Sequence, residues 1–187
     1  MNFAVFYSRY KLLIFTFTIE GVVLIGALFL ARLFGIKIFP LTTNIFRDVL
    51  IGTFWALLPL VFFFFLVSKK TDDIPIMGSL RKTIITDIKG LFSTTTLIEI
   101  CLISILAGFA EELLFRGVIQ VKLGILAASI LFGFLHFLTP AYGIIAIIMG
   151  LYIGILSHIY QSVFIPMQLH CIYDFGALVY LKYIVKT

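Results

Sequence analysis

The stretch AGFAEELLFRG, residues 107–117, places two adjacent carboxylates and one guanidinium inside an apolar run. Its alanine and leucine residues favour a helix, and the apolar residues continue upstream to Thr96. On a helix, Glu112 and Arg116 share a face with the acid N-terminal to the base, so we expect them to form an ion pair. Glu111 points roughly 100° away from Glu112 and lacks this partner. We therefore expect Glu111 to face a different helix of a bundle.

Charge is scarce throughout the chain. The 187 residues are 62% hydrophobic and 12% charged, with a mean hydropathy of +1.18. Soluble domains have about 45–50% apolar and about 25% charged residues. The composition therefore excludes a soluble globular domain, a disordered chain and a nucleic-acid-binding module, and indicates an integral membrane protein. Its net charge of +5 is expected to meet lipid headgroups, so the bilayer is the expected partner and nucleic acid is not.

Six apolar runs predict an all-α, polytopic transmembrane helix bundle of about six helices. They cover Leu12–Ala31, Val49–Val67, 96–117, 123–138, 141–158 and 163–181. The first run, at about 20 residues, is longer than the apolar region of a signal peptide and is expected to remain as an anchor helix. We expect residues 1–92 to form a transmembrane hairpin plus a basic interfacial linker, and residues 93–187 to form a four-helix core.

Residues 69–92 are more polar than the runs on either side. Ile84, Ile85 and Ile88 lie at helical spacing opposite Lys82 and Lys89, which fits an amphipathic helix in the membrane interface. A solvated loop fits the composition equally well.

Basic residues are distributed unevenly between the two sides of this predicted topology. One side has seven and the other has three: Arg9, Lys11, Lys69, Lys70, Arg81, Lys82 and Lys89 against Arg32, Lys37 and Arg47. The positive-inside rule then predicts a multi-pass protein of the cell membrane with both termini in the cytoplasm.

Two later helices also carry polar groups. His136 lies in LFGFLHFLTP (131–140), one turn after Phe132, and His170 lies in QLHCIYDFG (168–176), one turn before Asp174. The Asp174 carboxylate is close enough to accept a hydrogen bond from the His170 imidazole and to fix its tautomer. A single such residue would be an ordinary polar contact of a bundle core. Three helices with polar groups indicate a site.

A carboxylate and imidazoles facing each other in a dry bundle can activate water or bind a divalent metal. In the first hypothesis Glu111 takes a proton from water, His136 positions that water, and His170 with Asp174 stabilises the oxyanion of an attacked amide. In the second, Glu111, His136 and His170 hold a metal such as zinc. Both predict hydrolysis. Neither GxSxG nor HExxH is present, which disfavours serine chemistry and standard zincin chemistry.

Together these residues resemble the CPBP family, which comprises type II CAAX prenyl endopeptidases and bacteriocin-processing membrane proteins. The family motifs EExxxR, FxxxH and HxxxN/D match here Glu111-Glu112-Leu-Leu-Phe-Arg116, Phe132-Gly-Phe-Leu-His136 and His170-Cys-Ile-Tyr-Asp174. The resemblance covers about the last 90 residues. It implies a four-helix core and a metal-free, glutamate-dependent intramembrane endopeptidase acting on a membrane-associated peptide or protein.

The resemblance also implies roles for single residues. Glu111 and His136 would activate water, His170 and Asp174 would form the oxyanion site, and Glu112 with Arg116 would hold the site together. Asp174 stands where the eukaryotic CAAX enzymes have Asn. Because an ionised Asp cannot donate a hydrogen bond to an oxyanion, Asp174 is either protonated or orients His170.

Two functions of other classes remain open. A non-catalytic membrane partner, such as a bacteriocin self-immunity factor or a scaffold, needs the fold and not the chemistry. A proton- or ion-coupled carrier would use the same buried carboxylates.

The remaining polar residues are expected to have ordinary positions. Glu20 and Glu99 lie outside the motifs, with Glu99 solvated at the interface, and His158, Tyr142 and Tyr160 suit the interface as well. Cys101 and Cys171 lack disulfide or metal spacing and are expected to be buried thiols.

Overall fold

The computed structural model describes residues 9–185, and over this range the regular structure is entirely helical. Five helical segments of this range are long and apolar enough to cross a membrane: α1 (Arg9–Phe34), α2 (Ile45–Val67), the joined α5 and α6 (Leu97–Leu135), α7 (Pro140–Tyr160) and α8 (Phe164–Tyr183). The predicted polytopic all-α bundle is confirmed.

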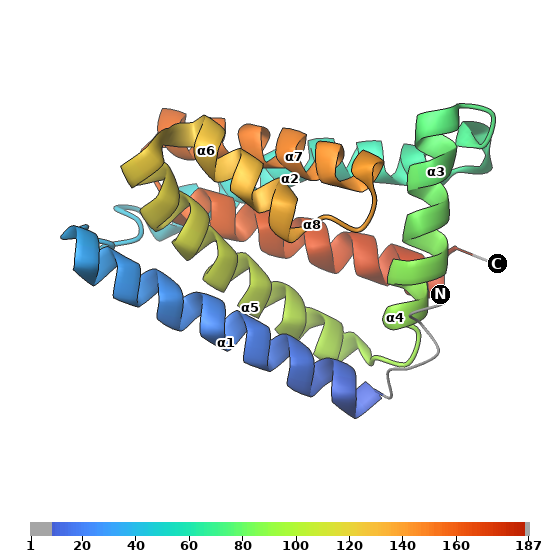
Figure 1. Ribbon diagram of the computed structural model, residues 1–187, viewed down its shortest axis with the longest axis horizontal. Helices are drawn as coiled ribbons and strands as arrows, with labels where there is room; N and C mark the ends of the chain where they lie inside the picture. Colours follow the sequence, from blue (N-terminus) through green and yellow to red (C-terminus); the bar gives the residue numbers. More distant parts are fainter. Residues whose placement is uncertain (1–8, 186–187) are drawn as a thin grey trace.

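Helix α8 runs through the middle of the bundle (Figure 1). Helix α2 and helix α5 both pack along α8, and α1 packs on α5. The two N-terminal helices therefore lie on opposite sides of the core. Each of them covers a different part of the segment 93–187.

The boundary between the third and fourth predicted helices differs from the expectation. Helix α5 (Leu97–Leu114) continues through a π-helical turn, η4 (Phe115–Ile119), into α6 (Gln120–Leu135), and the chain turns back at Gly124. Gly124 has φ 85° and ψ 168°, a conformation that glycine reaches without steric cost. The rest of α6, residues 125–135, is only about 16 Å long at 1.5 Å per residue.

This length corrects the predicted fourth span, 123–138. A helix needs about 20 residues to cross the hydrocarbon core, and α6 ends part-way along the bundle (Figure 1). His136 therefore lies at the C-terminal end of a short helix, directly before the loop that leads to α7.

The polar segment after α2 is helical, so the solvated-loop alternative is wrong. It comprises a short 3₁₀ turn, η2 (Lys69–Thr71), then α3 (Pro75–Thr83), a π-helical turn η3 (Ile84–Ile88), and α4 (Lys89–Leu91). Leu80 and Ile84 are buried against Phe63 and Leu66 of α2, whereas Lys82 is exposed. The amphipathic segment stands across one end of the bundle (Figure 1).

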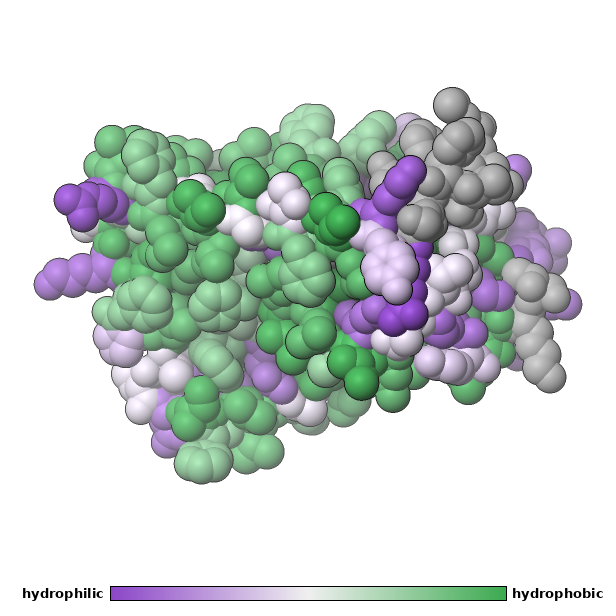
Figure 2. Space-filling view, turned by 90° about the horizontal axis from the view of Figure 1, so that it is seen from below, coloured by the Kyte–Doolittle hydropathy of each residue, from purple (hydrophilic) through white to green (hydrophobic). Residues whose placement is uncertain are grey.

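The surface has the polarity of a membrane protein. Figure 2 shows a hydrophobic middle with hydrophilic side chains at the two ends. At one end the Arg9 guanidinium lies 2.7 Å from the Glu99 carboxylate, and Glu99 also forms a capping box with Thr96 at the start of α5. Glu99 is therefore an ion-paired helix cap, and not a carboxylate held only by solvent. His158 is exposed near the end of α7.

Helices α5 and α8 are in close contact at a glycine. A Cβ atom on Gly108 would lie 2.6 Å from Cys171 Sγ and 2.9 Å from the Cys171 backbone nitrogen, so only glycine fits. Gly108 is one turn before Glu111 and Glu112, and Cys171 directly follows His170. This contact brings the carboxylates of α5 against the imidazole of α8. Cys101 and Cys171 are free and half-buried, less buried than expected.

Candidate active site

The buried carboxylate of Glu112 joins two helices. It lies 2.9 Å from Nη1 of Arg116 and accepts a 2.7 Å hydrogen bond from Nδ1 of His170. Glu112 is 0% exposed and Arg116 is 2% exposed, so the predicted ion pair forms within the core. The contact with His170 was not expected from the sequence, which pairs Glu112 only with Arg116.

Arg116 extends this network to two further helices. Its Nη2 donates to the carbonyl oxygen of Gly150 on α7 at 3.1 Å, and its guanidinium lies 4.9 Å from the ring centre of Phe132 on α6. A buried guanidinium needs several acceptors to offset the loss of water. Arg116 thus ties α5, α6 and α7 together around the carboxylate of Glu112.

Glu111 faces His136, as the helical geometry of α5 requires. The distance from Glu111 Oε2 to His136 Nε2 is 3.5 Å, and within residues 9–185 this oxygen has no hydrogen-bond partner. His136 Nδ1 lies 2.9 Å from the carbonyl oxygen of Phe132, so we assign the proton of the neutral ring to Nδ1. Nε2 then presents a lone pair beside the Glu111 carboxylate.

Two neighbouring acceptors of this kind can hold the two hydrogens of one water molecule. The His136 ring is held in place for this by stacking on Phe132, with ring centres 4.2 Å apart and planes inclined by 24°. The backbone hydrogen bond to Phe132 fixes the same ring through its other nitrogen. Phe132 therefore positions His136 twice, by its ring and by its carbonyl.

His170 has carboxylates on both sides. Its Nε2 lies 3.4 Å from Asp174 Oδ2, which is longer than an ordinary hydrogen bond, whereas its Nδ1 is 2.7 Å from Glu112. The expected pairing with Asp174 is within ion-pair distance, but the tight contact is with Glu112. Asp174 retains 27% exposure of its side chain.

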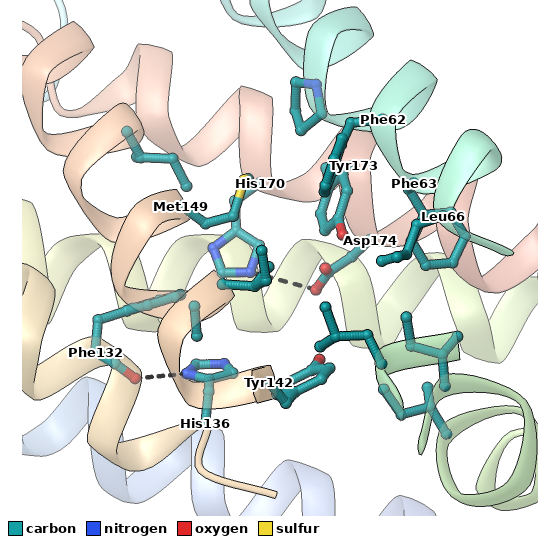
Figure 3. A pocket seen from close by; sticks show the side chains of 17 residues that line it. Phe62, Phe63, Leu66, Phe132, His136, Tyr142, Met149, His170, Tyr173 and Asp174 are labelled. Carbon is teal, nitrogen blue, oxygen red and sulfur yellow. Dashed lines mark hydrogen bonds and ion pairs between the residues drawn. The ribbon is translucent and has the colours of Figure 1, made fainter. Parts of the chain in front are cut away.

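A cavity of about 110 Å³ adjoins the two histidines (Figure 3). His136, His170 and Asp174 form its polar side, and the ring of Phe132 is stacked on that of His136. The rest of the wall is mostly apolar and comes from α2, α3, η3, α7 and α8, with Pro59, Phe62, Phe63, Leu66, Leu80, Ile84, Ile88, Ile145, Ala146, Met149 and Ile153. The cavity therefore extends from the histidines toward the amphipathic segment at the end of the bundle.

Two tyrosines of this cavity were not predicted as site residues. Tyr142 was expected at the membrane interface, but it lines the cavity together with Tyr173. Figure 3 shows both hydroxyl groups pointing toward Asp174, from α7 and α8. The sequence offers one weak signal, because Tyr173 lies between the two polar residues of the last motif. The cavity position of Tyr142 depends on the loop after His136.

A third unexpected group is Glu20 of α1. It is 7% exposed, and Oε2 has no hydrogen-bond partner in the described part of the chain. It interacts electrostatically with Glu111 and His170 across the α1–α5 contact. The site therefore has another carboxyl group behind Glu111.

The alternative zinc set does not converge on one point. In residues 9–185 no three side chains of the His, Cys, Asp and Glu types are grouped as metal ligands. His136 Nε2 faces Glu111, but both nitrogens of His170 face carboxylates. Glu111, His136 and His170 are thus not arranged as a ligand shell.

Comparisons with known proteins agree with the geometry. Residues 93–176 match the family model described as "Type II CAAX prenyl endopeptidase Rce1-like". A protein of Bacillus subtilis (strain 168), called "Uncharacterized protein YpbD", is 35% identical over 89 residues, which are 46% of this chain and 47% of that protein. The match thus spans about half the length of this curated relative. No solved structure gives a significant match.

The matched segment contains the whole network around Glu112, the pair of Glu111 with His136, and Asp174. Residues 93–176 of this membrane protein are therefore similar to the Rce1-like family of type II CAAX prenyl endopeptidases.

Proposed function

We propose that the protein is an intramembrane endopeptidase that hydrolyses a peptide bond of a membrane-associated peptide or protein. The observation that carries the proposal is the pair of free acceptors, Glu111 Oε2 and His136 Nε2, 3.5 Å apart and beside an apolar cavity. One water bound between them would lose a proton to Glu111 as its oxygen attacks the substrate carbonyl. The same proton then passes to the leaving amine, which restores the Glu111 carboxylate.

The second carboxylate has a structural role in this proposal. Glu112 is enclosed by Arg116 and His170, so it is screened from the cavity and paired with two donors. Glu112 holds α5 against α8 through His170, and Arg116 ties this network to α6 and α7, so that Glu111 is held opposite the end of α6. Residues 93–187 would then supply the chemistry.

Residues 1–92 would supply part of the substrate site. Phe62 and Phe63 of α2, Leu80 of α3 and Ile84 of η3 line the cavity and lie outside the matched segment. An apolar side chain of the substrate beside the scissile bond would replace water in this cavity, which supports a hydrophobic, membrane-associated substrate.

We also propose that both termini lie in the cytoplasm of a cell. The described chain ends lie at the same end of the bundle as α3 and α4, where basic residues are concentrated (Figure 1). Labelling with a membrane-impermeant thiol reagent tests this orientation. We expect Lys37→Cys to react in intact cells and Lys70→Cys to react only after the cells are opened; the reverse pattern contradicts it.

The proteolytic proposal is tested with Glu111→Gln. Membrane proteomes of cells carrying the wild-type or the variant gene are compared to find a precursor that remains uncleaved in the variant. The purified proteins are then assayed on that precursor in liposomes. We expect cleavage to fall by at least about 10²-fold when the general base is lost.

A matched control is Glu99→Gln. It makes the same change on the same helix, at the capping position far along α5 from the cavity, where glutamine also completes a capping box. This variant should cleave as the wild type does. Cleavage that survives both Glu111→Gln and His136→Ala would overturn the proposal, and rescue of a deletion phenotype by these variants would identify a binding function instead.

A further inference from the structure

The two histidines and Asp174 of the proposed site offer no free hydrogen-bond donor to the oxyanion. Hydrolysis of an amide places negative charge on the carbonyl oxygen, and a donor aimed at this oxygen is a large contribution to catalysis. His170 is the expected donor, but its two ring nitrogens face Glu112 and Asp174 at 2.7 Å and 3.4 Å. An ionised Asp174 only accepts hydrogen bonds.

Tyr142 has the required free donor. It lies in the first turn of α7, where the side chain of Thr139 caps the helix by accepting a hydrogen bond from the Tyr142 backbone nitrogen. The ring lines the cavity together with His136, His170 and Asp174. Its hydroxyl makes no hydrogen bond within residues 9–185, so the donor is available to a ligand in the cavity.

The position of this hydroxyl relative to the proposed base is favourable. Figure 3 shows the hydroxyl of Tyr142 directed across the cavity toward Asp174, with the ring beside His136. Tyr142 interacts electrostatically with both Asp174 and Glu111. A carbonyl group in the cavity would therefore lie between the hydroxyl of Tyr142 and the water held by Glu111 and His136.

We propose that the Tyr142 hydroxyl donates the hydrogen bond that stabilises the oxyanion. The proposal rests on the endopeptidase function above. Glu111 takes one proton from water, the water oxygen bonds to the carbonyl carbon, and the carbonyl π electrons move onto the oxygen that faces Tyr142. When the C–N bond breaks, these electrons reform the carbonyl, and the amine takes the proton from Glu111. Tyr142 keeps its own proton throughout.

Tyr173 provides a matched comparison. Its hydroxyl also points toward Asp174 and lines the same cavity, and its electrostatic partners are Tyr142 and Asp174. Tyr142 differs from it by the position of its ring, which lies beside His136, the partner of the proposed base (Figure 3). Removing the two hydroxyls one at a time therefore distinguishes the loss of an oxyanion donor from a general loss of polarity in the cavity.

The test measures kcat and KM of Tyr142→Phe, Tyr173→Phe and Glu111→Gln on the precursor found above. For Tyr142→Phe we expect kcat to fall about 10²- to 10³-fold, as for loss of one oxyanion donor, while KM stays within about threefold. Because Tyr173 also lines the substrate cavity, Tyr173→Phe is expected to change KM, but its loss of kcat should be at least about tenfold smaller than that of Tyr142→Phe. A Tyr142→Phe variant with wild-type kcat overturns the assignment, and so does an equal loss in Tyr173→Phe.

A binding measurement keeps the assignment testable apart from turnover. The scissile amide of the substrate peptide is replaced by a phosphinate, whose oxygens mimic the tetrahedral intermediate, or by a non-cleavable reduced amide. Tyr142→Phe should weaken binding of the phosphinate by about tenfold or more and leave binding of the reduced amide unchanged. Equal weakening of both ligands would mean a merely structural role and overturns the assignment.

The two proposals fail in different ways. If cleavage depends on Glu111 but is unaffected by Tyr142→Phe, only the assignment of Tyr142 as the oxyanion donor is overturned. If the wild-type protein does not cleave, or if cleavage survives Glu111→Gln, the proposed endopeptidase function is overturned. The assignment of Tyr142 as a donor then falls with it.

Discussion

Glu111 and Glu112 are neighbours on α5, yet their carboxylates have separate environments. Glu112 is fully buried between Arg116 and His170, whereas Glu111 Oε2 faces His136 Nε2 at 3.5 Å without a hydrogen-bond partner among residues 9–185. The rotation of about 100° between successive residues of a helix produces this difference. One carboxylate is therefore fixed in a structural network, while the other remains open to a ligand.

Arg116→Ala should destabilise the fold strongly. The change leaves the buried carboxylate of Glu112 without its guanidinium, and breaking such a pair costs about 3–5 kcal/mol. The free energy of unfolding is measured in detergent with the fluorescence of Trp55, the only tryptophan of the sequence.

The control for this change is Asp72→Ala. The Asp72 side chain is 50% exposed and pairs with Arg81, which keeps its hydrogen bond to the Val67 carbonyl, so loss of this pair should cost no more than about 1 kcal/mol. Equal losses in the two variants would mean that the burial of the Glu112 pair has no energetic consequence.

Gly108→Ala should separate α5 from α8. The added Cβ would lie 2.9 Å from the backbone nitrogen of Cys171, which cannot move aside as a flexible side chain does. Overpacking of this kind costs about 1–3 kcal/mol, and it also displaces Glu112 from His170, so both stability and cleavage should fall.

Gly21→Ala on α1 should have the opposite effect on stability. A Cβ there meets no atom within 4 Å, and alanine in a helix is favoured over glycine by about 0.5–1 kcal/mol. Thermal unfolding in detergent of the two variants compares them directly. A Gly108→Ala protein as stable and active as Gly21→Ala would show that the close contact is dispensable.

The sequence predicted the parts of the site that depend on one helix. Spacing of four residues on α5 predicts the pair of Glu112 with Arg116, and the same helix geometry directs Glu111 elsewhere. The partner of His170 was missed, because Glu112 reaches it only through the contact of Gly108 with Cys171, 63 residues away in sequence. Such a contact depends on how two helices pack, and no local pattern encodes it.

The length of α6 was also missed, for a different reason. The apolar residues of the fourth run continue to Leu138. The last part of α6, however, begins only after the turn at Gly124, where φ is positive, and it ends at Leu135. His136 directly follows this short helix, and the following loop places Tyr142 in the cavity and not at the interface. A glycine inside an apolar run was the available signal for this turn.

Met149→Trp should reduce cleavage by filling the cavity. Met149 lines the apolar wall, and a larger side chain there competes with an apolar substrate residue. We expect kcat/KM to fall by about tenfold or more, mainly through KM. Ile148→Trp is the control, since Ile148 is 53% exposed on the same helix and should leave the kinetics unchanged. Equal kinetics of the two variants would place the substrate elsewhere.

Chelators should leave cleavage unchanged, within about twofold. A zinc ion would need free lone pairs of Glu111, His136 and His170 directed at one point, but both ring nitrogens of His170 face carboxylates, those of Glu112 and Asp174. The purified protein is incubated with EDTA or 1,10-phenanthroline, and its cleavage rate is compared before and after addition of zinc. Loss of activity that stoichiometric zinc restores would instead make these three residues metal ligands, and it would require His170 to release Glu112 or Asp174.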